Sequence, residues 1–485
     1  MDAAIPLGAR IGGARLAGQL GEWRIRGARS ASADLSAALR LLVLDGRLPA
    51  GTRLPAEREL AQALGASRTM ITAALDHLRT EGFVASRQGS GSWITLPATA
   101  ASPAAEPPVE PRLLNLAHAA LPAPHELVAA VDAARLRLPE YMSDPGYHQC
   151  GLDLLRRRIA DRYTERGLPT TADQVVVTNG AHHAFVLVLR LLVGPGDRVL
   201  VEQPTYPNAL HAIRSASGLP VPVALTEDGW DLDGIEAAIR QSAPRLAYLQ
   251  TDFHNPTGLR MSEEDRGRLV ALLRRTRTFA VIDETMVELD LGADGPSPRP
   301  PVACFGEDHV ITIGSASKTY WGGLRLGWVR APVELVHRLV AARSAVDLGS
   351  PVFDQLILAE LLSDPEPVLR RRRGEIAVLR DALVSALRQH CPQWSFRVPD
   401  GGLSLWCRLD APISSRLAVA ARGFGLRLAL SSGFAVHGGM ERRLRLPYAL
   451  PAEVLAGAAR DLGRLAASVG GGGSLSTVDD ELPVA

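Results

Sequence analysis

Near the start of the chain, apolar residues recur at the spacing expected of three helices. The stripe of the first helix consists of Leu35, Leu39, Leu42 and Val43, spaced i, i+4, i+7 and i+8. This helix is predicted to end at Gly46, and a short second helix is expected over 56–65. A third follows Ser67, a good N-cap residue, and ends at Gly82. Two short helices joined by a tight glycine-containing turn predict a helix-turn-helix.

The residues after the third helix predict how the chain is divided. Segment 83–96 reads as two short strands around a Gly-rich tip, a hairpin that would form a wing beside the helix-turn-helix. The Pro/Ala tract 97–111 cannot hold a core and is expected to be a semi-rigid linker. It separates a winged helix-turn-helix domain, 31–96, from a larger block, 112–469, in which strands alternate with helices.

The two ends of the chain lack apolar periodicity. Residues 1–30 are rich in Gly, Ala and Arg, and we expect a flexible basic arm there. Residues 470–485 begin with GGGGS and continue as an acidic stretch, which is typical of a disordered tail.

Composition narrows the possible partners. The 485 residues suffice for about three domains, and the formal net charge is +1. This balance excludes a chain that is basic throughout but leaves room for one basic face. Residues 1–96 contain 12 Arg and 8 acidic residues, the charge sign that a DNA partner requires.

The four cysteines form no CxxC pair and show no metal-ligand spacing, so free thiols in a reducing compartment and no metal are expected. The first residues of the sequence show no apolar core of signal-peptide length, and no uninterrupted apolar run of about 18 residues occurs along it. We therefore expect a soluble cytoplasmic protein without a membrane partner.

Polar residues of the first block lie where a DNA-binding unit would use them. Ser67, Arg68 and Thr69 begin the third helix, whose N-terminus in such units meets phosphates and base edges. Arg53 and Arg58 flank the second helix. A three-helix interaction module with solvated arginines is the alternative, and periodicity alone does not separate the two.

A longer motif favours DNA binding. The stretch from Gly46-Arg47-Leu48 to Ser67-Arg68 follows G-x-L-x-x-G-x-x-L-P-x-x-R-x-L-A-x-x-x-G-x-S-R and resembles the winged helix-turn-helix of GntR-type bacterial regulators. The wing sequence Gly89-Ser90-Gly91 is similar as well. The resemblance implies a double-stranded DNA operator as partner, contacted by Arg53, Arg58, Ser67, Arg68, Thr69 and Gly89. It also implies a bacterial protein that is associated with the nucleoid when bound to DNA.

One residue count bears on the chemistry of the second block. Of the 53 Lys and Arg residues only one is a lysine, Lys318. An arginine stays charged and cannot replace a lysine whose amine must lose its proton and attack a carbonyl. Chance survival of one lysine is the alternative, and the surroundings of Lys318 decide between the two.

Apolar strands of the second block end in small or polar residues, as they do where open α/β sheets bind ligands. These strands are Val175–Val177, Arg198–Val201, Arg245–Leu249, Phe279–Ile282 and Val310–Ile313. The first runs into the turn Gly180-Ala181, whose bare N–H groups at a helix start can bind phosphate, although an ordinary strand-to-helix turn fits too. The last leads to Ser315-Ala316-Ser317-Lys318, with Arg325 seven residues on.

Asp283 follows the fourth strand directly. A carboxylate at the end of a buried strand is costly unless it is paired, and the alternative is an Asp that caps the next helix. A lysine amine can form a Schiff base with an aldehyde, and the nearby hydroxyls and Arg325 can bind an anion. Pyridoxal 5′-phosphate (PLP) requires a lysine, a carboxylate for its ring nitrogen and a phosphate site. All three are present, so PLP is the predicted cofactor.

Residues 112–468 resemble a fold-type I aminotransferase, and the whole chain resembles the MocR-type branch of GntR regulators. The implied fold class is α/β, with an N-terminal winged helix-turn-helix, a large domain with a mostly parallel sheet, and a smaller C-terminal α/β domain. In this resemblance Lys318 holds the internal aldimine, Asp283 pairs with the pyridinium nitrogen, and Asn255 bonds the phenolic oxygen. Tyr206 stacks on the ring.

The resemblance also assigns the remaining cofactor positions. The phosphate is bound by Gly180, Ala181, His182, Ser315, Ser317 and Arg325. Tyr147 corresponds to a tyrosine that reaches the phosphate across a homodimer interface. Arg445, in LRLPY, corresponds to the arginine that takes the α-carboxylate of a substrate or effector, with an ordinary surface arginine as the alternative.

Two positions depart from the family pattern. Thr285 stands where a tyrosine commonly touches the phenolic oxygen, and His182 replaces the more usual glutamine of the phosphate turn. Neither change argues against cofactor binding, but both cast doubt on efficient transamination.

Three functions remain open. The first is a transcription regulator whose aminotransferase-like domain senses PLP, or an amino acid or amine effector, through aldimine exchange at Lys318. The second is a working aminotransferase that carries a DNA-binding head, and the third is a regulator without cofactor. The head favours regulation, because a pure enzyme has no use for a winged helix-turn-helix.

Overall fold

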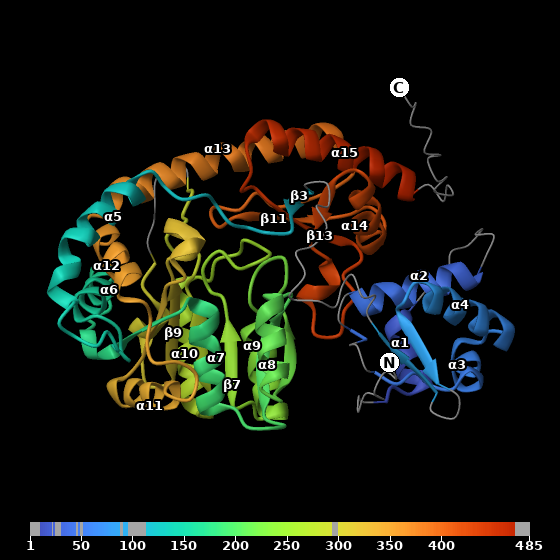
Figure 1. Cartoon of the computed structure of the whole chain (residues 1–485), viewed down its shortest axis with the longest axis horizontal. Coiled ribbons are helices and arrows are strands. Elements are labelled where there is room, and N and C mark those ends of the chain that lie inside the picture. Colours follow the sequence, from blue (N-terminus) through green and yellow to red (C-terminus); the bar gives the residue numbers. More distant parts are fainter. Residues whose placement is uncertain are drawn as a thin grey trace.

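The computed structural model describes residues 10–21, 23–24, 31–44, 47–48, 52–87, 91–95, 113–292 and 299–470. Figure 1 shows a small N-terminal domain beside a much larger α/β body. The predicted linker, the wing tip with Gly89, and residues 471–485 lie outside the described residues.

The N-terminal domain contains the three predicted helices, α2 (Ala31–Leu44), α3 (Glu57–Leu64) and α4 (Arg68–Thr80). Strands β1 (Val84–Arg87) and β2 (Gly91–Ile94) pair antiparallel and form the wing. Their apolar residues share one core, which includes Leu35, Leu39, Leu60, Ile71, Leu75 and Leu78. The helix-turn-helix and its hairpin are thus confirmed.

The prediction of a flexible arm over residues 1–30 is wrong for its middle part. Gly13–Leu20 forms helix α1, and Leu16 is fully buried in the core of the domain. The first turn is held by Glu59, whose carboxylate accepts a hydrogen bond from the Gly13 N–H at 2.8 Å. A Cβ at Gly13 would lie 3.1 Å from the Glu59 backbone oxygen, so the glycine allows α1 to approach α3 closely. A helix of eight residues with two glycines, GARLAGQL, is too short to show its apolar face clearly in the sequence.

The large domain is built on a seven-stranded sheet of order β4-β10-β9-β8-β7-β5-β6. The strands are β4 (Val175–Thr178), β5 (Arg198–Gln203), β6 (Leu219–Ala224), β7 (Leu246–Leu249), β8 (Phe279–Asp283), β9 (Val310–Ser315) and β10 (Gly327–Arg330). Neighbours run parallel except β10, which is antiparallel to β4 and to β9. The five predicted strands are confirmed, whereas β6 and β10 were not predicted.

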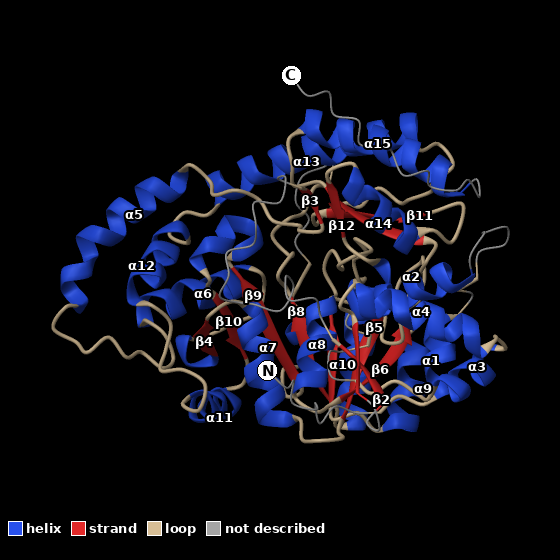
Figure 2. Cartoon of the chain, turned by 45° about the vertical axis from the view of Figure 1, so that its right-hand side comes forward, coloured by secondary structure: helices blue, strands red, loops and turns tan. Residues whose placement is uncertain are grey.

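Helices cover both faces of the sheet, because alternate strand residues enter two separate cores. Ala280 and Ile282 of β8 pack with α5 (Glu126–Arg137), α6 (Asp153–Glu165), α9 (Leu232–Ser242), α10 (Glu263–Thr276) and α12 (Val352–Leu361). Val281, between them, packs on the other face with α7 (Ala181–Leu192), α8 (Pro207–Ser215) and α11 (Val333–Arg343). Figure 2 shows the sheet between these layers. Burial on both faces explains the near-continuous apolar strand sequences.

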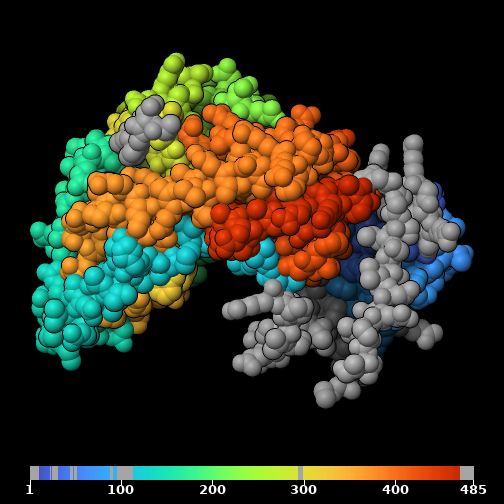
Figure 3. All heavy atoms as spheres, turned by 90° about the horizontal axis from the view of Figure 1, so that it is seen from above, coloured from blue at the N-terminus to red at the C-terminus, as the bar shows by residue number. Residues whose placement is uncertain are grey.

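A smaller domain packs around a third core. Strands β11 (Ser404–Arg408) and β13 (Arg443–Pro447) pair antiparallel. The other elements are β12 (Leu426–Leu428) and the helices α13 (Glu366–His390), α14 (Ser414–Gly423) and α15 (Ala452–Gly470). Figure 3 shows α13 and α15 side by side along one surface of the body. The fold class predicted from the sequence is confirmed.

The first segment after the predicted linker belongs to this smaller domain. Strand β3 (Leu114–Leu116) pairs parallel with β12, with Asn115 opposite Arg427. The chain then passes over the carboxyl ends of the central strands before it enters α5. Among the described helices, none combines the length and apolar character that crossing a membrane requires.

Candidate functional site

The carboxyl ends of the central strands open into a cavity of about 770 Å³, which the smaller domain closes on the opposite side. Its walls bring together most of the predicted site residues, namely Gly180, Ala181, His182, Tyr206, Asn255, Asp283, Ser315, Ser317, Lys318, Arg325 and Arg445. Tyr147 does not line the cavity of its own chain and is 69% exposed.

Lys318 lies directly after β9, in the short π-helical turn Ser317–Trp321. Its Nζ donates a hydrogen bond to the Ala119 carbonyl oxygen at 2.7 Å. Burial, and then the positive charge of Arg445, lowers the pKa of Lys318 to about 8, although Asp283 acts in the opposite direction. The amine is therefore much easier to deprotonate than an exposed lysine, as attack on an aldehyde requires.

Asp283 ends β8 and is only 8% exposed. One carboxylate oxygen accepts a hydrogen bond from the Tyr248 hydroxyl at 2.6 Å, and the other accepts from the Thr285 N–H at 2.9 Å. No helix begins within the described residues 284–292, so Asp283 is not a helix cap. The carboxylate is instead oriented by two donors at the wall of the cavity.

Tyr248 is a site residue that the sequence did not reveal. It is buried in the middle of β7, and burial together with the Asp283 charge raises its pKa well above the usual value. The phenol therefore remains protonated and donates to Asp283, while it accepts a hydrogen bond from the Gln250 amide at 2.9 Å. A tyrosine within an apolar strand was the only signal, and aromatic residues in strands are common.

One end of the cavity is suited to a phosphate. Gly180 precedes α7 with φ +94°, and a Cβ there would lie 3.0 Å from Nη2 of Arg325. Only a glycine allows the guanidinium to lie so close to the helix start, where unpaired N–H groups attract anions. The hydroxyls of Ser315 and Ser317 are 2.8 Å apart at the same end. Burial, and then the positive charges of His211 and Arg325, lowers the pKa of His182, which favours the neutral imidazole.

Arg445 marks the opposite side of the cavity. It lies on β13 and is only 7% exposed, so it is not an ordinary surface arginine. Its guanidinium donates to the Asn255 side-chain oxygen at 3.3 Å and to the Ala117 carbonyl, and it lies over the Phe434 ring. Nε is buried and has no hydrogen-bond partner, and burial lowers the pKa of Arg445 to about 10. A buried guanidinium with unused donor capacity favours an anionic ligand.

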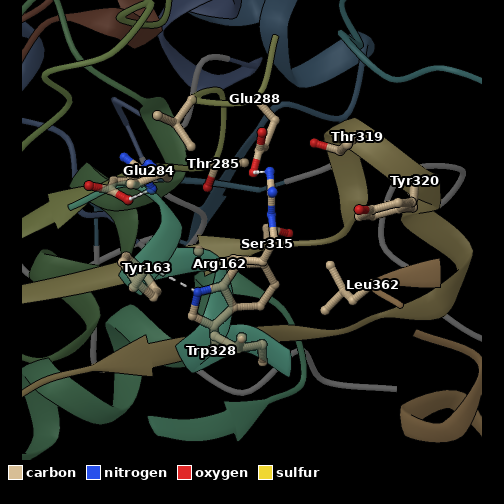
Figure 4. Close-up of a pocket in the computed structure, with 14 residues that line it drawn as sticks. Arg162, Tyr163, Glu284, Thr285, Glu288, Ser315, Thr319, Tyr320, Trp328 and Leu362 are labelled. Atoms are coloured by element: carbon tan, nitrogen blue, oxygen red, sulfur yellow. Dashed lines mark hydrogen bonds and ion pairs between the residues drawn. The ribbon is translucent and has the colours of Figure 1, made fainter. Parts of the chain in front are cut away.

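A second, smaller cavity of about 40 Å³ adjoins the first (Figure 4). Thr285 and Ser315 line both cavities, and the Thr285 hydroxyl is buried without a hydrogen-bond partner. Apolar and aromatic side chains such as Ile159, Trp328 and Leu362 form most of the lining of the smaller cavity, and the Glu284–Arg166 ion pair at 2.6 Å adds a charged part to the wall. The smaller cavity is large enough for water. Thr285, in place of tyrosine, thus lies in the wall that the two cavities share.

The predicted DNA-binding residues lie on the surface of the N-terminal domain. Ser67, Arg68 and Thr69 are exposed at the start of α4, where the Ser67 hydroxyl accepts a hydrogen bond from the Met70 N–H at 3.2 Å. Arg53 and Arg58 are exposed on either side of the start of α3, and Arg53 lies beside the wing.

The described cavity fits PLP, with an amine, a carboxylate and a phosphate end in the required order, and it belongs to a chain with a winged helix-turn-helix. Residues 113–462 match the family model of aminotransferase class I and II, and residues 31–94 match that of bacterial regulatory proteins of the gntR family. These matches define an aminotransferase domain joined to a GntR head, and its cofactor is pyridoxal 5′-phosphate.

Relatives of known name share all or part of this architecture. The probable rhizopine catabolism regulatory protein MocR of Rhizobium meliloti is 30% identical over 444 residues, which cover 85% of this chain and 88% of that protein. The chain therefore belongs to the MocR-type subfamily of GntR regulators.

The aminotransferase part also has enzyme relatives. The 2-aminoadipate transaminase of Thermus thermophilus is 32% identical over 298 residues, covering 60% of this chain and 75% of that enzyme. The crystal structure of the α-aminoadipate aminotransferase LysN from Thermus thermophilus, complexed with N-(5′-phosphopyridoxyl)-L-leucine, superposes with a TM-score of 0.68 at 29% identity. It covers 74% of this chain and 94% of that chain.

Proposed function

We propose that the chain is a transcription regulator whose aminotransferase domain senses PLP, or an amino acid or amine that reacts with it, by exchange at Lys318. One observation carries the proposal. Lys318 and Arg445 both donate hydrogen bonds to the segment Ala117–Ala119, which follows the predicted linker to the DNA-binding head.

This segment is fixed on both sides of the cavity. Strand β3 pairs with β12, and the Asn115 side chain accepts a hydrogen bond from the Ala117 N–H at 3.0 Å. Beyond the cavity, Arg372 donates to the carbonyl oxygens of Pro122 and Tyr320. The two carbonyl contacts in between, to Lys318 and Arg445, are the ones that a ligand of the cavity competes for.

Competition by a ligand would weaken the hold on the segment Ala117–Ala119, and the free energy involved can be estimated. When bound, PLP supplies an aldehyde that condenses with amines and a ring that accepts electrons. A ligand that occupies the Lys318 amine or the Arg445 guanidinium removes a donor from the segment, and hydrogen bonds to charged groups contribute about 1.5–3 kcal/mol each. Coupling energies between sites are commonly about 1–3 kcal/mol. The exchange is thus large enough to alter the placement of the DNA-binding heads.

In this proposal each cavity residue has a defined task. Lys318 provides the reactive amine, and Asp283 holds a proton on the ring nitrogen. Asn255 and Tyr206 position the ring. The phosphate is bound by Gly180, Ala181, His182, Ser315, Ser317 and Arg325. Arg445 takes the α-carboxylate of an amino acid.

A homodimer is part of the proposal. Val128, Leu136, Met142 and Tyr147 are large, exposed apolar residues within one stretch of the body. Covering them with a second copy would bring the partner's Tyr147 toward the phosphate end. Two heads related by a two-fold axis would suit an operator with two half-sites.

The alternative is a working aminotransferase with a DNA-binding head, which the enzyme relatives favour. Thr285 and His182 weigh against efficient turnover. Thr285 replaces the tyrosine that commonly touches the phenolic oxygen of the cofactor, and His182 replaces the more usual glutamine of the phosphate turn. The two functions differ in their products. A sensor binds its ligand without completing a reaction cycle. An aminotransferase releases a keto acid and leaves the pyridoxamine form of the cofactor.

The test measures DNA affinity and cofactor absorption on the same protein. An operator is first selected from random duplexes, and its affinity is measured by fluorescence anisotropy with PLP and a panel of amino acids and amines. We expect at least one ligand to change the affinity about 5- to 150-fold. The Lys318→Ala variant should keep DNA binding but lose the response. A response of equal size in that variant, or none in the wild type, contradicts the proposal.

A further inference from the structure

The charged residues that line the cavity are not balanced. Lys318, Arg325, Arg427 and Arg445 are cationic, and Asp252 and Asp283 are acidic. The carboxylate of Asp252 is bound by two arginines, Arg266 at 2.6 Å and Arg260 at 3.2 Å. Asp283 therefore faces the four cations alone, and the cavity favours ligands with more than one anionic group.

The proposed function uses three of these cations but leaves Arg427 without a role. Arg427 is the middle residue of β12, between the buried Leu426 and Leu428. Because strand side chains alternate, its own side chain points away from the small-domain core and lines the cavity. Within the described residues its guanidinium forms neither a hydrogen bond nor an ion pair with any other residue. Its five donors are available to a ligand.

His118 also lines the cavity, in the segment that leaves β3. Its Nδ1 is 3.3 Å from the Asn115 amide nitrogen, and Asn115 is the residue opposite Arg427 across β3 and β12. Burial and the positive charges of Arg427, Arg445 and Lys318 lower the pKa of His118, in that order. The imidazole thus lies within the field of all three cations, with Arg427 acting on it most strongly.

We propose that Arg427 and His118 form a subsite for a second anionic group, so that the effector is a dicarboxylic amino acid. Arg445 takes the α-carboxylate, the amino group reaches the Lys318 position, and the distal carboxylate lies between His118 and Arg427. This inference rests on the proposed function, because it names the chemical class of the ligand for the same cavity. A distal carboxylate can accept two parallel hydrogen bonds from the planar guanidinium, which a neutral side chain cannot match.

The experiment compares ligands that differ only in distal charge. The PLP-loaded full-length protein is titrated with L-glutamate and L-2-aminoadipate, and with L-glutamine and L-norleucine as neutral counterparts, while cofactor absorption is recorded. We expect an acidic ligand to bind at least about tenfold more tightly than its neutral counterpart, the size of one charge-assisted contact. In Arg427→Gln the affinity for the acidic ligand should fall about tenfold, and that for the neutral one should stay within about twofold.

Two controls separate the subsite from a general effect. Arg422→Gln removes an exposed arginine of the same domain that does not line the cavity, and should leave both affinities unchanged. His118→Gln keeps a hydrogen-bonding group and should lower acidic affinity less than Arg427→Gln does. Equal losses for acidic and neutral ligands in Arg427→Gln would mean a structural role and would overturn the inference, as would no loss at all.

A second readout keeps this inference distinct from the proposed function. Glutarate carries two carboxylates without an amine, and n-butyrate carries one, so neither needs exchange at Lys318. Glutarate should raise the thermal unfolding midpoint of the wild type more than butyrate does, and the difference should vanish in Arg427→Gln. If this holds while DNA affinity responds to no ligand, the subsite stands and the regulatory proposal fails. If glutarate and n-butyrate raise the unfolding midpoint equally, the proposed subsite is overturned.

Discussion

At the scale of single residues, the environment of Lys318 decides what the cavity can do. An ordinary lysine has a pKa near 10.4 and is almost entirely protonated at pH 7. With the pKa lowered to about 8, roughly a tenth of the Lys318 amines are neutral at that pH. Burial is the main cause, and Arg445 adds to it, so the same arginine that would bind a carboxylate also prepares the amine.

This environment predicts the pH dependence of PLP binding. Only the neutral amine attacks an aldehyde, so the rate of formation of the cofactor absorption band should rise as pH increases through about 8 and then level off. Removing the positive charge in Arg445→Gln should move the inflection to higher pH, because a nearby cation disfavours the protonated amine. Stopped-flow mixing with PLP between pH 6 and 10 measures the inflection in the wild type and in the variant. An inflection near pH 10 in the wild type would contradict the lowered pKa of Lys318, and a downward shift in the variant would contradict the effect of Arg445.

A second residue-scale prediction concerns the support of Asp283. Tyr248→Phe removes the 2.6 Å hydrogen bond and leaves a buried carboxylate with one donor fewer. The free energy of unfolding should fall by about 1–3 kcal/mol. Urea denaturation of the PLP-free protein measures the change. Tyr320→Phe is the matched control, since Tyr320 is also buried but its hydroxyl bonds to no other described residue, and it should cost less than about 1 kcal/mol.

At the scale of elements, the sequence predicts what local signals determine. Helix α4 begins after its Ser67 cap, and strands β8 and β9 end where their apolar runs end. Strand β10 was not predicted because Gly327–Arg330 is only four residues long and, with a glycine at its start and an arginine at its end, does not form an apolar run. Helix α1 was not predicted because it has only eight residues, two of them glycines, and its first turn depends on a contact with the distant Glu59.

The same distinction applies to the candidate site. Motifs around Asn255, Asp283 and Lys318 could be read from strand ends, because the carboxyl ends of parallel strands meet in one place. The roles of Arg427 and His118 could not be read in this way. Each residue reaches the cavity only because β3 pairs with β12, and these two strands are more than 300 residues apart in the sequence. Contacts of that kind depend on tertiary packing and leave no local pattern.

Helix α4 contains two arginines with different expected roles. Arg68 is exposed at the helix start and makes no side-chain hydrogen bond to a described residue. Arg79 instead donates to Ser86 of the wing at 2.8 Å and pairs with Glu57 of α3 at 3.3 Å. Arg68 is thus free to meet DNA, whereas Arg79 connects three elements of the domain.

Alanine substitution should separate these roles. Arg68→Ala should weaken operator binding about tenfold or more, with hydrogen exchange of the N-terminal domain and the cofactor spectrum unchanged. Arg79→Ala should increase hydrogen exchange in α3 and the wing, because it removes contacts between them. Anisotropy and hydrogen-exchange mass spectrometry give the two readouts. Unaltered operator affinity in Arg68→Ala at physiological salt would show that α4 does not read DNA through its first turn.

At the scale of the whole molecule, the division into a head and a body follows from composition, since a Pro/Ala tract cannot join a core. The functional connection between head and body does not follow from composition. In the proposed function, this connection depends on the segment of residues 117–119, which follows β3 and accepts hydrogen bonds from Lys318 and Arg445. A ligand can change the heads only if it binds two arrangements of the molecule differently, and this segment is where that difference can arise.

The dimer proposal makes a prediction that a single chain cannot satisfy. If Tyr147 completes the phosphate site of the partner subunit, homodimers of Tyr147→Phe should bind PLP about 10- to 100-fold more weakly, by the loss of one charge-assisted hydrogen bond. Homodimers of Lys318→Ala should form no covalent band. A mixed dimer of the two variants, isolated with different tags, has one site with its own Lys318 and an intact tyrosine from the partner.

The mixed dimer should therefore bind PLP covalently at about half the wild-type stoichiometry, at concentrations that leave the Tyr147→Phe homodimer largely empty. If Tyr147 acted within its own chain, the chain with Lys318 would lack its tyrosine, and the mixed dimer would show no high-affinity site. Spectral titration of the three dimers gives opposite results for the two arrangements. Because Tyr147 is 69% exposed and outside the cavity of its own chain, we expect the first.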